Sequence, residues 1–243
     1  MSPETQPLLQ VTGLVKRFGG FRALDGLQFH LNAGEILGLV GPNGSGKTTC
    51  INVISGLYAQ DDGEIRLGNR SIGGLPSHRL VHAGINRTFQ IPKPFLTMTV
   101  LQNVEVSLAY GGHGQEGLDP HYFLKLLDLE SHAGQPAAEL NSAQQKLLDL
   151  ARALATKPRV LLVDELAAGL NPAELEKIAA KLKDLARGGM AVLVVEHLMG
   201  FIDQVTDRVV VMNAGKEIFE GVLSDAIRNP RVVEVFLGQD DAT

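Results

Sequence analysis

A glycine-rich segment, Gly41–Thr48, carries the residue types that bind phosphate. It reads Gly-Pro-Asn-Gly-Ser-Gly-Lys-Thr, follows an apolar run and opens a helical pattern. In that order, glycines let backbone N–H groups turn inward around phosphate oxygens, and the helix N-terminus adds the positive end of its dipole. Lys47 is suited to neutralise the β- and γ-phosphates, and the Thr48 hydroxyl can bind Mg²⁺. The residues predicted here to contact a nucleotide are Gly41, Pro42, Asn43, Gly44, Ser45, Gly46, Lys47, Thr48 and Thr49.

Two adjacent acids, Asp164 and Glu165, follow a second apolar run at 160–163. Downstream of a phosphate-binding loop, Asp164 can hold the shell of a Mg²⁺ ion, and Glu165 can polarise a water in line with the γ-phosphate. The loop alone is compatible with kinases, GTPases, helicases and transport ATPases. A kinase needs no base at this position, because its nucleophile arrives with the acceptor substrate. The acid pair therefore favours hydrolysis.

A third apolar run, 192–195, ends in the titratable pair Glu196 and His197. Ligands of a doubly wound sheet lie at the carboxyl ends of its strands. Glu165 and His197 both occupy such ends, and we expect both to lie beside the strand that leads into the phosphate-binding loop. His197 is then placed to contact the γ-phosphate or the attacking water.

The elements that must position these residues alternate along the chain. Short β-branched runs at Glu35–Val40, Arg159–Val163 and Met190–Val195 predict buried strands of a parallel sheet. Helical patterns follow the first two runs, at Lys47–Ser55 and Pro172–Arg187. This alternation indicates an α/β core with crossover helices.

Two other kinds of segment flank and interrupt that core. Leu8–Ala33 alternates like an antiparallel arm, and Asp207–Glu220 has the pattern of a hairpin. From Pro92 to about Lys157 strand signals are absent, and apolar residues recur at helical spacing in Tyr122–Leu129 and Gln144–Ala155. The middle third therefore predicts a helical insertion.

Composition and charge argue against several classes of protein. The chain has 243 residues with 22 Lys+Arg against 27 Asp+Glu, and a formal charge of −5 is unlike the basic surface of a nucleic-acid binder. The single Cys50 excludes an internal disulfide. We expect no signal peptide, and no apolar run approaches the ~20 residues of a spanning helix. If the protein works at a membrane, a partner must cross it.

The chain resembles the ATP-binding-cassette (ABC) family over nearly its whole length. The resemblance rests on the order of the phosphate-binding loop, Gln90, Leu140–Gln144, Asp164-Glu165 and His197. It implies an α/β fold: a RecA-like P-loop NTPase core with a parallel sheet, an antiparallel β arm and a helical subdomain insertion. Residues 1–243 would form a single ABC ATPase domain, with the core in 1–90 and 157–243 and the helical subdomain in 91–156.

The resemblance also assigns roles to side chains. Gln90 would belong to the catalytic and Mg²⁺-binding residues and couple nucleotide state to a membrane partner. Phe18 would stack on the adenine of ATP. Asn141, Ala143 and Gln144 would open a helix that faces the nucleotide held by the opposite subunit, so that hydrolysis needs a dimer.

The chain departs from the family pattern in three segments. The common signature is Leu-Ser-Gly-Gly-Gln, and this chain has Leu140-Asn-Ser-Ala-Gln144. Asn141 can donate a hydrogen bond as serine would, whereas Ala143 adds a methyl group where glycine lets the backbone approach closely. The other departures are Leu166 in place of proline and Asn171 in place of aspartate. Because the catalytic acid and histidine are both present, an active enzyme is favoured over a degenerate partner.

Within the family, the chain resembles the longer ATPase type of the bacterial branched-chain amino acid uptake group. The segments that carry this likeness are 87–90, 167–172 and 228–238. It implies that a second ATPase subunit pairs with this one, in a homodimer or preferably a heterodimer. The dimer would act on two transmembrane permease subunits and, indirectly, with a periplasmic solute-binding protein. The protein would then lie at the cytoplasmic face of the bacterial inner membrane. Urea, amide and aromatic-acid importers share much of this pattern.

Two other functions compete with the importer motor. A soluble ABC-type ATPase that acts on DNA or ribosomes would commonly carry a long coiled-coil insertion or two cassettes, and neither is found. A small-molecule P-loop kinase is disfavoured by Gln90, Glu165 and His197 together. The apolar residues between Gln90 and Val104 fit either a docking surface for membrane subunits or the core of the helical subdomain. They include Pro92, Pro94, Phe95 and Met98.

Overall fold

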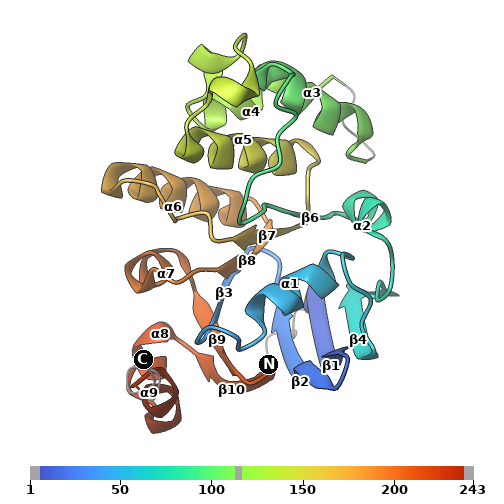
Figure 1. The fold of residues 1–243 in the computed structure, drawn as a ribbon, viewed down its shortest axis with the longest axis vertical. Helices are drawn as coiled ribbons and strands as arrows, with labels where there is room; N and C mark the ends of the chain where they lie inside the picture. Colours follow the sequence, from blue (N-terminus) through green and yellow to red (C-terminus); the bar gives the residue numbers. More distant parts are fainter. Residues whose placement is uncertain (1–5, 113–116, 238–243) are drawn as a thin grey trace.

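The computed structural model describes residues 6–112 and 117–237, and Gly238, the last residue of the tail segment, lies outside them. Figure 1 shows a central sheet, a second sheet beside it and a group of helices above. The central sheet has the strand order β10-β9-β3-β8-β7-β6, and every neighbouring pair is parallel except β10 with β9. Its strands are β3 (Ile36–Val40), β6 (Ile85–Arg87), β7 (Val160–Asp164), β8 (Ala191–Val195), β9 (Arg208–Asn213) and β10 (Lys216–Gly221).

The three β-branched runs form the middle of this sheet. Every residue of β3, β7 and β8 is buried. Alternate residues of β3 face opposite layers: Leu37 belongs to the apolar core shared with the antiparallel sheet, and Ile36 to the core shared with the helices. Because successive side chains point to opposite faces, a strand covered on both faces needs apolar residues throughout.

The antiparallel sheet has the order β2-β1-β4-β5, and its strands β1 and β2 form the predicted arm. Its strands are β1 (Leu9–Phe18), β2 (Phe21–Leu31), β4 (Asp62–Leu67) and β5 (Arg70–Ser71). β1 and β2 pair from Leu9↔Leu31 to Phe18↔Phe21, so the turn between them is Gly19-Gly20. This places Phe18 and Phe21 side by side at one end of the arm.

Helices cover the central sheet and form the upper part of the molecule. Between β6 and β7 the described residues hold helices and no strand, and α3, α4 and α5 pack on one another there. The α-helices are α1 (Lys47–Ile54), α2 (Ser77–Ala83), α3 (Val100–Tyr110), α4 (Pro120–Leu126), α5 (Ser142–Ala155), α6 (Pro172–Arg187), α7 (Met199–Val205), α8 (Leu223–Ala226) and α9 (Pro230–Leu237).

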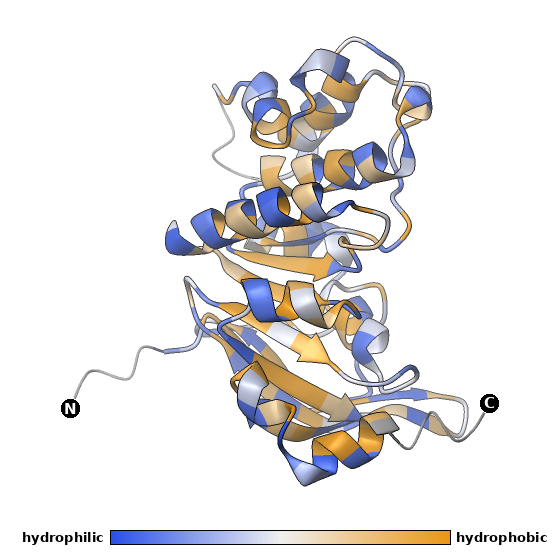
Figure 2. Cartoon of the chain, turned by 90° about the vertical axis from the view of Figure 1, so that its left-hand side faces the viewer, coloured by the Kyte–Doolittle hydropathy of each residue, from blue (hydrophilic) through white to orange (hydrophobic). Residues whose placement is uncertain are grey.

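The predicted fold class is confirmed: a mostly parallel core, an antiparallel arm and helices inserted between core strands. Figure 2 shows the apolar residues concentrated in the sheets and on the inner faces of the helices. Among residues 6–112 and 117–237, no helix has the length and apolar character that a bilayer crossing requires.

Candidate nucleotide-binding and catalytic site

The phosphate-binding loop joins β3 to α1, and two of its glycines are required by close backbone contacts. Gly41 has φ 151° and Gly46 has φ 105°. A Cβ atom at Gly41 would lie 2.3 Å from the Met212 carbonyl oxygen, and one at Gly46 would lie 2.5 Å from that of Ala23. Strands β9 and β2 therefore press on the loop from outside, and only glycine fits there. No side chain within the described ranges caps α1, so its first N–H groups are not engaged by a cap.

Lys47 lies inside this loop. Its Nζ donates hydrogen bonds to the carbonyl oxygens of Gly41 (2.7 Å) and Pro42 (2.9 Å), and the residue is buried. Burial lowers the pKa of the Lys47 ammonium, while the nearby charges of Glu165 and Asp164 act in the opposite direction. These two acids balance the ammonium, which fits a site built for a phosphate chain.

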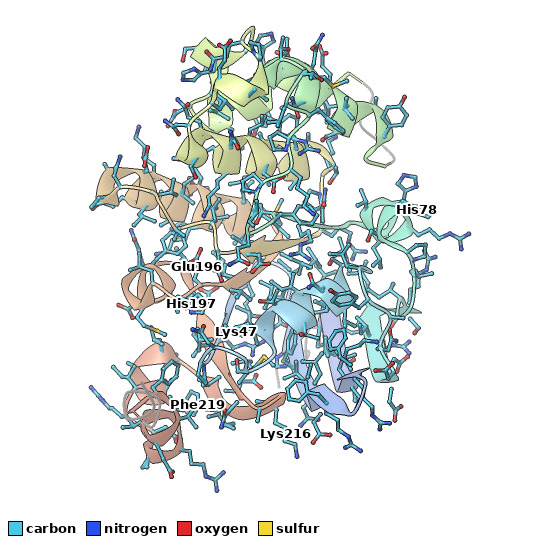
Figure 3. All side chains as sticks on the ribbon, viewed as in Figure 1. Lys47, His78, Glu196, His197, Lys216 and Phe219 are labelled. Carbon is cyan, nitrogen blue, oxygen red and sulfur yellow. The ribbon has the colours of Figure 1, made fainter. Side chains whose placement is uncertain are left out.

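A cleft of about 340 Å³ opens in front of the loop. Phe18 stands at one wall, in an edge-to-face contact with Tyr58 at 5.3 Å between ring centroids. In Figure 3, Lys47 and His197 lie near one another in the middle of the molecule. The residues that line the cleft are Phe18, Phe21, Ala23, Asn43, Gly44, Gly46, Lys47, Thr48, Thr49, Gln90, Glu165 and His197.

Glu165 is held from four directions at the end of β7. Its Oε2 accepts a hydrogen bond from Gln90 Nε2 at 2.6 Å, and its Oε1 lies 3.1 Å from His197 Nε2. The backbone has φ 47°, a left-handed conformation that a non-glycine residue adopts only when its surroundings fix it. Its N–H donates to the Val195 carbonyl at 2.9 Å, and Lys146 Nζ donates to its carbonyl at 2.6 Å. The carboxylate is thus presented to the cleft in one orientation.

Asp164, the preceding residue, is fully buried. Its Oδ2 accepts a hydrogen bond from Arg87 Nη2 at 2.8 Å, whereas its Oδ1 is buried and has no hydrogen-bond partner among residues 6–112 and 117–237. Burial raises the pKa of the Asp164 carboxyl, and the Arg87 guanidinium is the strongest influence against that rise. An unpartnered buried carboxylate oxygen beside a phosphate-binding loop is the kind of group that a hard cation such as Mg²⁺ satisfies.

Glu196 has a neighbouring but different position. It is buried, and its Oε1 accepts the Ala167 N–H at 2.6 Å. Burial raises the pKa of Glu196 to about 7. It therefore holds the loop that follows Glu165 and does not line the cleft.

The signature-like segment forms the start of α5, as the resemblance implied. Asn141 Oδ1 accepts the Gln144 N–H at 2.8 Å, and Gln144 Oε1 accepts the Asn141 N–H at 3.0 Å. This reciprocal pair is a capping box. Neither residue lines the cleft, and neither does Ala143. Within one chain the structure therefore keeps these three residues apart from the phosphate-binding loop.

The strand order corrects one expectation. His197 follows β8, which pairs with β3, so His197 does lie beside the strand of the phosphate-binding loop. Glu165 follows β7, and β8 stands between β7 and β3. Glu165 is two strands away and reaches the cleft through the side-chain contacts described above.

Several residues at the site were not identified from the sequence. Phe21 could have been found, because it faces Phe18 across the Gly19-Gly20 turn. The contacts of Arg87 and Lys146 could not, because they join elements far apart in the chain: Arg87 to β7 and α1, and Lys146 to the loop after β7.

Comparison with known proteins gives a consistent result. The model of the ABC transporter family matches residues 24–168. The chain is 33% identical to the high-affinity branched-chain amino acid transport ATP-binding protein BraF of Pseudomonas aeruginosa, over 97% of this chain and 99% of that protein. It superposes on the ADP conformation of an ATP-binding cassette of an ABC transporter with a TM-score of 0.85 and 33% identity, covering 96% of this chain and 100% of that one. A dimeric cassette in a post-hydrolysis state bound to ADP and Pi matches with a TM-score of 0.80 and 27% identity, over 88% and 98% of the two chains.

Proposed function

Because this chain belongs to the ABC transporter family, whose ATP-binding subunits are ATPases, we propose that it powers an importer of branched-chain amino acids or a related small polar solute. The chemistry of that role is ATP hydrolysis. The cargo is inferred from the named relatives, since substrate contacts are made by other subunits.

The arrangement around Glu165 carries the proposal for hydrolysis. Its carboxylate lines the cleft between Gln90 Nε2 and His197 Nε2, at 2.6 Å and 3.1 Å. A carboxylate held in this way can orient a water and accept its proton as the water attacks the γ-phosphate. His197 contacts the γ-phosphate or that water. Both residues remain able to act because they are only partly buried.

The nucleotide occupies the cleft from the aromatic wall to the loop. Adenine stacks on Phe18, which is 44% exposed. The phosphates accept hydrogen bonds from the backbone N–H groups of the loop and from the Lys47 ammonium. The proposed contacts from this chain are Gly41, Pro42, Asn43, Gly44, Ser45, Gly46, Thr48 and Thr49.

Magnesium accompanies the nucleotide. The Thr48 hydroxyl, the free Oδ1 of Asp164 and the side-chain oxygen of Gln90 would hold it. The Gln90 amide nitrogen donates to Glu165, which leaves its oxygen for the metal. The ion would neutralise charge on the β- and γ-phosphates.

Two cassettes close around two ATP molecules in this proposal. Asn141, Ala143 and Gln144 at the start of α5 contact the γ-phosphate of the partner's nucleotide, and the partner is a second, related ATPase subunit. This chain acts as one ABC ATPase domain with a core (1–90 and 157–243) and a helical subdomain (91–156).

Segment 91–98 is the proposed docking surface for two transmembrane permease subunits. Four of its apolar side chains are exposed, from Ile91 at 76% to Met98 at 37%, whereas Pro92 and Pro94 are half-buried and the following Val100 and Val104 are fully buried. Gln90 directly precedes this surface, so permease movement would reach Glu165 through one side chain. The protein would lie at the cytoplasmic face of the inner membrane, and a periplasmic solute-binding protein would deliver the cargo.

Glu165→Gln tests the proposed function. We expect the variant to bind ATP with parent affinity, to accumulate as an ATP-dependent dimer, and to lose hydrolysis by at least about a hundredfold, a loss of roughly 3 kcal/mol of transition-state stabilisation. In cells that rely on the parent gene, uptake of labelled leucine should fall in parallel. Glu174→Gln, a carboxylate in the first turn of α6, serves as the control. Hydrolysis by Glu165→Gln at the parent rate would show that Glu165 is not the base.

A further inference from the structure

Arg87, the last residue of β6, joins three separate parts of the core. Its side chain is only 7% exposed. Nη2 donates to Asp164 Oδ2 at 2.8 Å, and Nη1 donates to Asn52 Oδ1 at 2.6 Å and Ser55 Oγ at 3.1 Å. Asp164 ends β7, whereas Asn52 and the C-cap Ser55 belong to α1. One guanidinium thus fixes the end of β7 against the helix that begins at the phosphate-binding loop.

These two elements supply two of the three proposed ligands of the Mg²⁺ ion. Thr48 is in the first turn of α1, and Asp164 is the last residue of β7. We propose that Arg87 is a positioning residue for the metal: it holds one oxygen of Asp164 so that the other faces the ion, and it sets the spacing between Asp164 and α1. The inference rests on the proposed function, because it takes Asp164 as a metal ligand.

The free oxygen of Asp164 is the observation that favours this role. Arg87 donates to Oδ2, and Oδ1 is buried without a hydrogen-bond partner in the part of the chain that the structure describes. A carboxylate that served only to neutralise a buried arginine would gain by offering it both oxygens, since the guanidinium fork matches a carboxylate in that way. Here the fork is divided between Asp164 and α1. One carboxylate oxygen is left for another cation.

A lysine cannot reproduce this arrangement. Arg87 also donates through Nε to the Thr88 carbonyl at 3.1 Å, so its planar guanidinium donates to four acceptors. An ammonium keeps the charge but is a compact point charge. Arg87→Lys therefore tests whether the positive charge alone is sufficient or the guanidinium geometry is needed. If geometry sets the metal site, the variant folds and binds ATP but holds Mg²⁺ more weakly.

The experiment measures metal affinity directly. Mn²⁺ serves as a spectroscopic probe. The electron-paramagnetic-resonance signal of free Mn²⁺ decreases as the ion binds, and this decrease gives its dissociation constant in the ATP complex. For Arg87→Lys and Arg87→Met we expect metal affinity to fall by about tenfold or more, the range found when residues that orient metal ligands are removed. ATP binding measured in EDTA should stay within about twofold of the parent. Arg87→Lys keeps the test open if Arg87→Met does not fold.

Two further variants separate the possible outcomes. Arg208→Lys is the matched control, because Arg208 is a mostly buried arginine that bonds Glu35, Glu220 and the His30 carbonyl away from the cleft; we expect lower stability and unchanged metal affinity. Asp164→Asn should lose metal affinity outright. If Asp164→Asn keeps it, the proposed metal ligand is wrong and the inference falls with it. If Asp164→Asn loses metal affinity and both Arg87 variants keep it, only the role of Arg87 is overturned.

Discussion

Two helices of this molecule begin where the chain is proposed to meet phosphate, and they begin in different ways. α1 starts after Gly46, whose φ is 105°, and no side chain of the described residues caps it. α5 starts after Asn141, and a capping box with Gln144 satisfies one N–H at each end of the first turn. At the start of α1 the backbone N–H groups are left for a ligand to bind. At the start of α5 some of these N–H groups are already bonded within the chain.

This difference matches the work proposed for each end. A capping box stabilises a helix start that must stand alone, which suits α5 before a partner arrives. α1 is instead fixed from outside, by strands β2 and β9 pressing on glycines, and needs no cap. A binding site formed within one chain can be kept in its binding conformation by the rest of the fold. A site that a partner chain completes must keep its conformation in the monomer, before the partner binds.

The largest expected effect comes from removing charge at the α1 end. In Lys47→Ala the phosphate chain loses the buried ammonium that now bonds Gly41 and Pro42. We expect ATP affinity to fall by about a hundredfold, or roughly 3 kcal/mol, the upper range for a charged hydrogen bond. Calorimetric titration with ATP measures it. Lys177→Ala on the exposed side of α6 is the control, and equal affinity for both variants would contradict the proposed cradle.

The second prediction tests whether α1 is positioned by contact with the strands. Gly46→Ala would place a methyl group 2.5 Å from the Ala23 carbonyl oxygen at φ 105°. Gly44→Ala has a similar positive φ of 77° but meets nothing within 4 Å. Strain from φ alone costs about 1–2 kcal/mol, so Gly44→Ala should lose about that much and Gly46→Ala clearly more.

Urea unfolding and ATP binding are measured on both glycine variants. We expect Gly46→Ala to lose ATP affinity as well as stability, because the loop must move away from β2. If the two variants behave alike, the close approach of Ala23 does not shape the loop, and the contrast between the two helix ends loses its physical basis.

Local sequence pattern predicted much of this architecture, because a strand that is buried on both faces of a sheet appears in the sequence as a continuous apolar run. The runs ending at Val40, Val163 and Val195 lie within one residue of β3, β7 and β8, and α6 has the predicted bounds Pro172–Arg187. The elements that were not identified are β4, β5, β6, α2, α3 and α7 to α9. β6 has three residues, too few for any periodicity, and its place at the sheet edge comes from pairing with β7.

The site residues divide in the same way, into those that a local pattern identifies and those that only the tertiary structure brings together. Motifs identify Lys47, Asp164 and Glu165, because their chemistry depends on neighbours in the sequence. Strand order is a tertiary property, so the expectation that Glu165 lies beside β3 was wrong. The bonds from Arg87 to Asp164, and from Lys146 to the Glu165 carbonyl, join residues 77 and 19 positions apart. Such contacts leave no signal in one sequence.

The smallest effect is expected at the start of α5, and it decides whether that end is a phosphate site at all. Asn141→Ala and Thr99→Ala each remove the N-cap of a capping box, on α5 and α3 respectively. Both should lose about 1 kcal/mol of unfolding free energy, measured in urea. In a Glu165→Gln background only Asn141→Ala should weaken the ATP-dependent dimer, because a frayed first turn no longer presents its N–H groups to the partner's nucleotide. An unchanged dimer would mean that the cap serves α5 alone, and that the two helix ends are not two halves of one site.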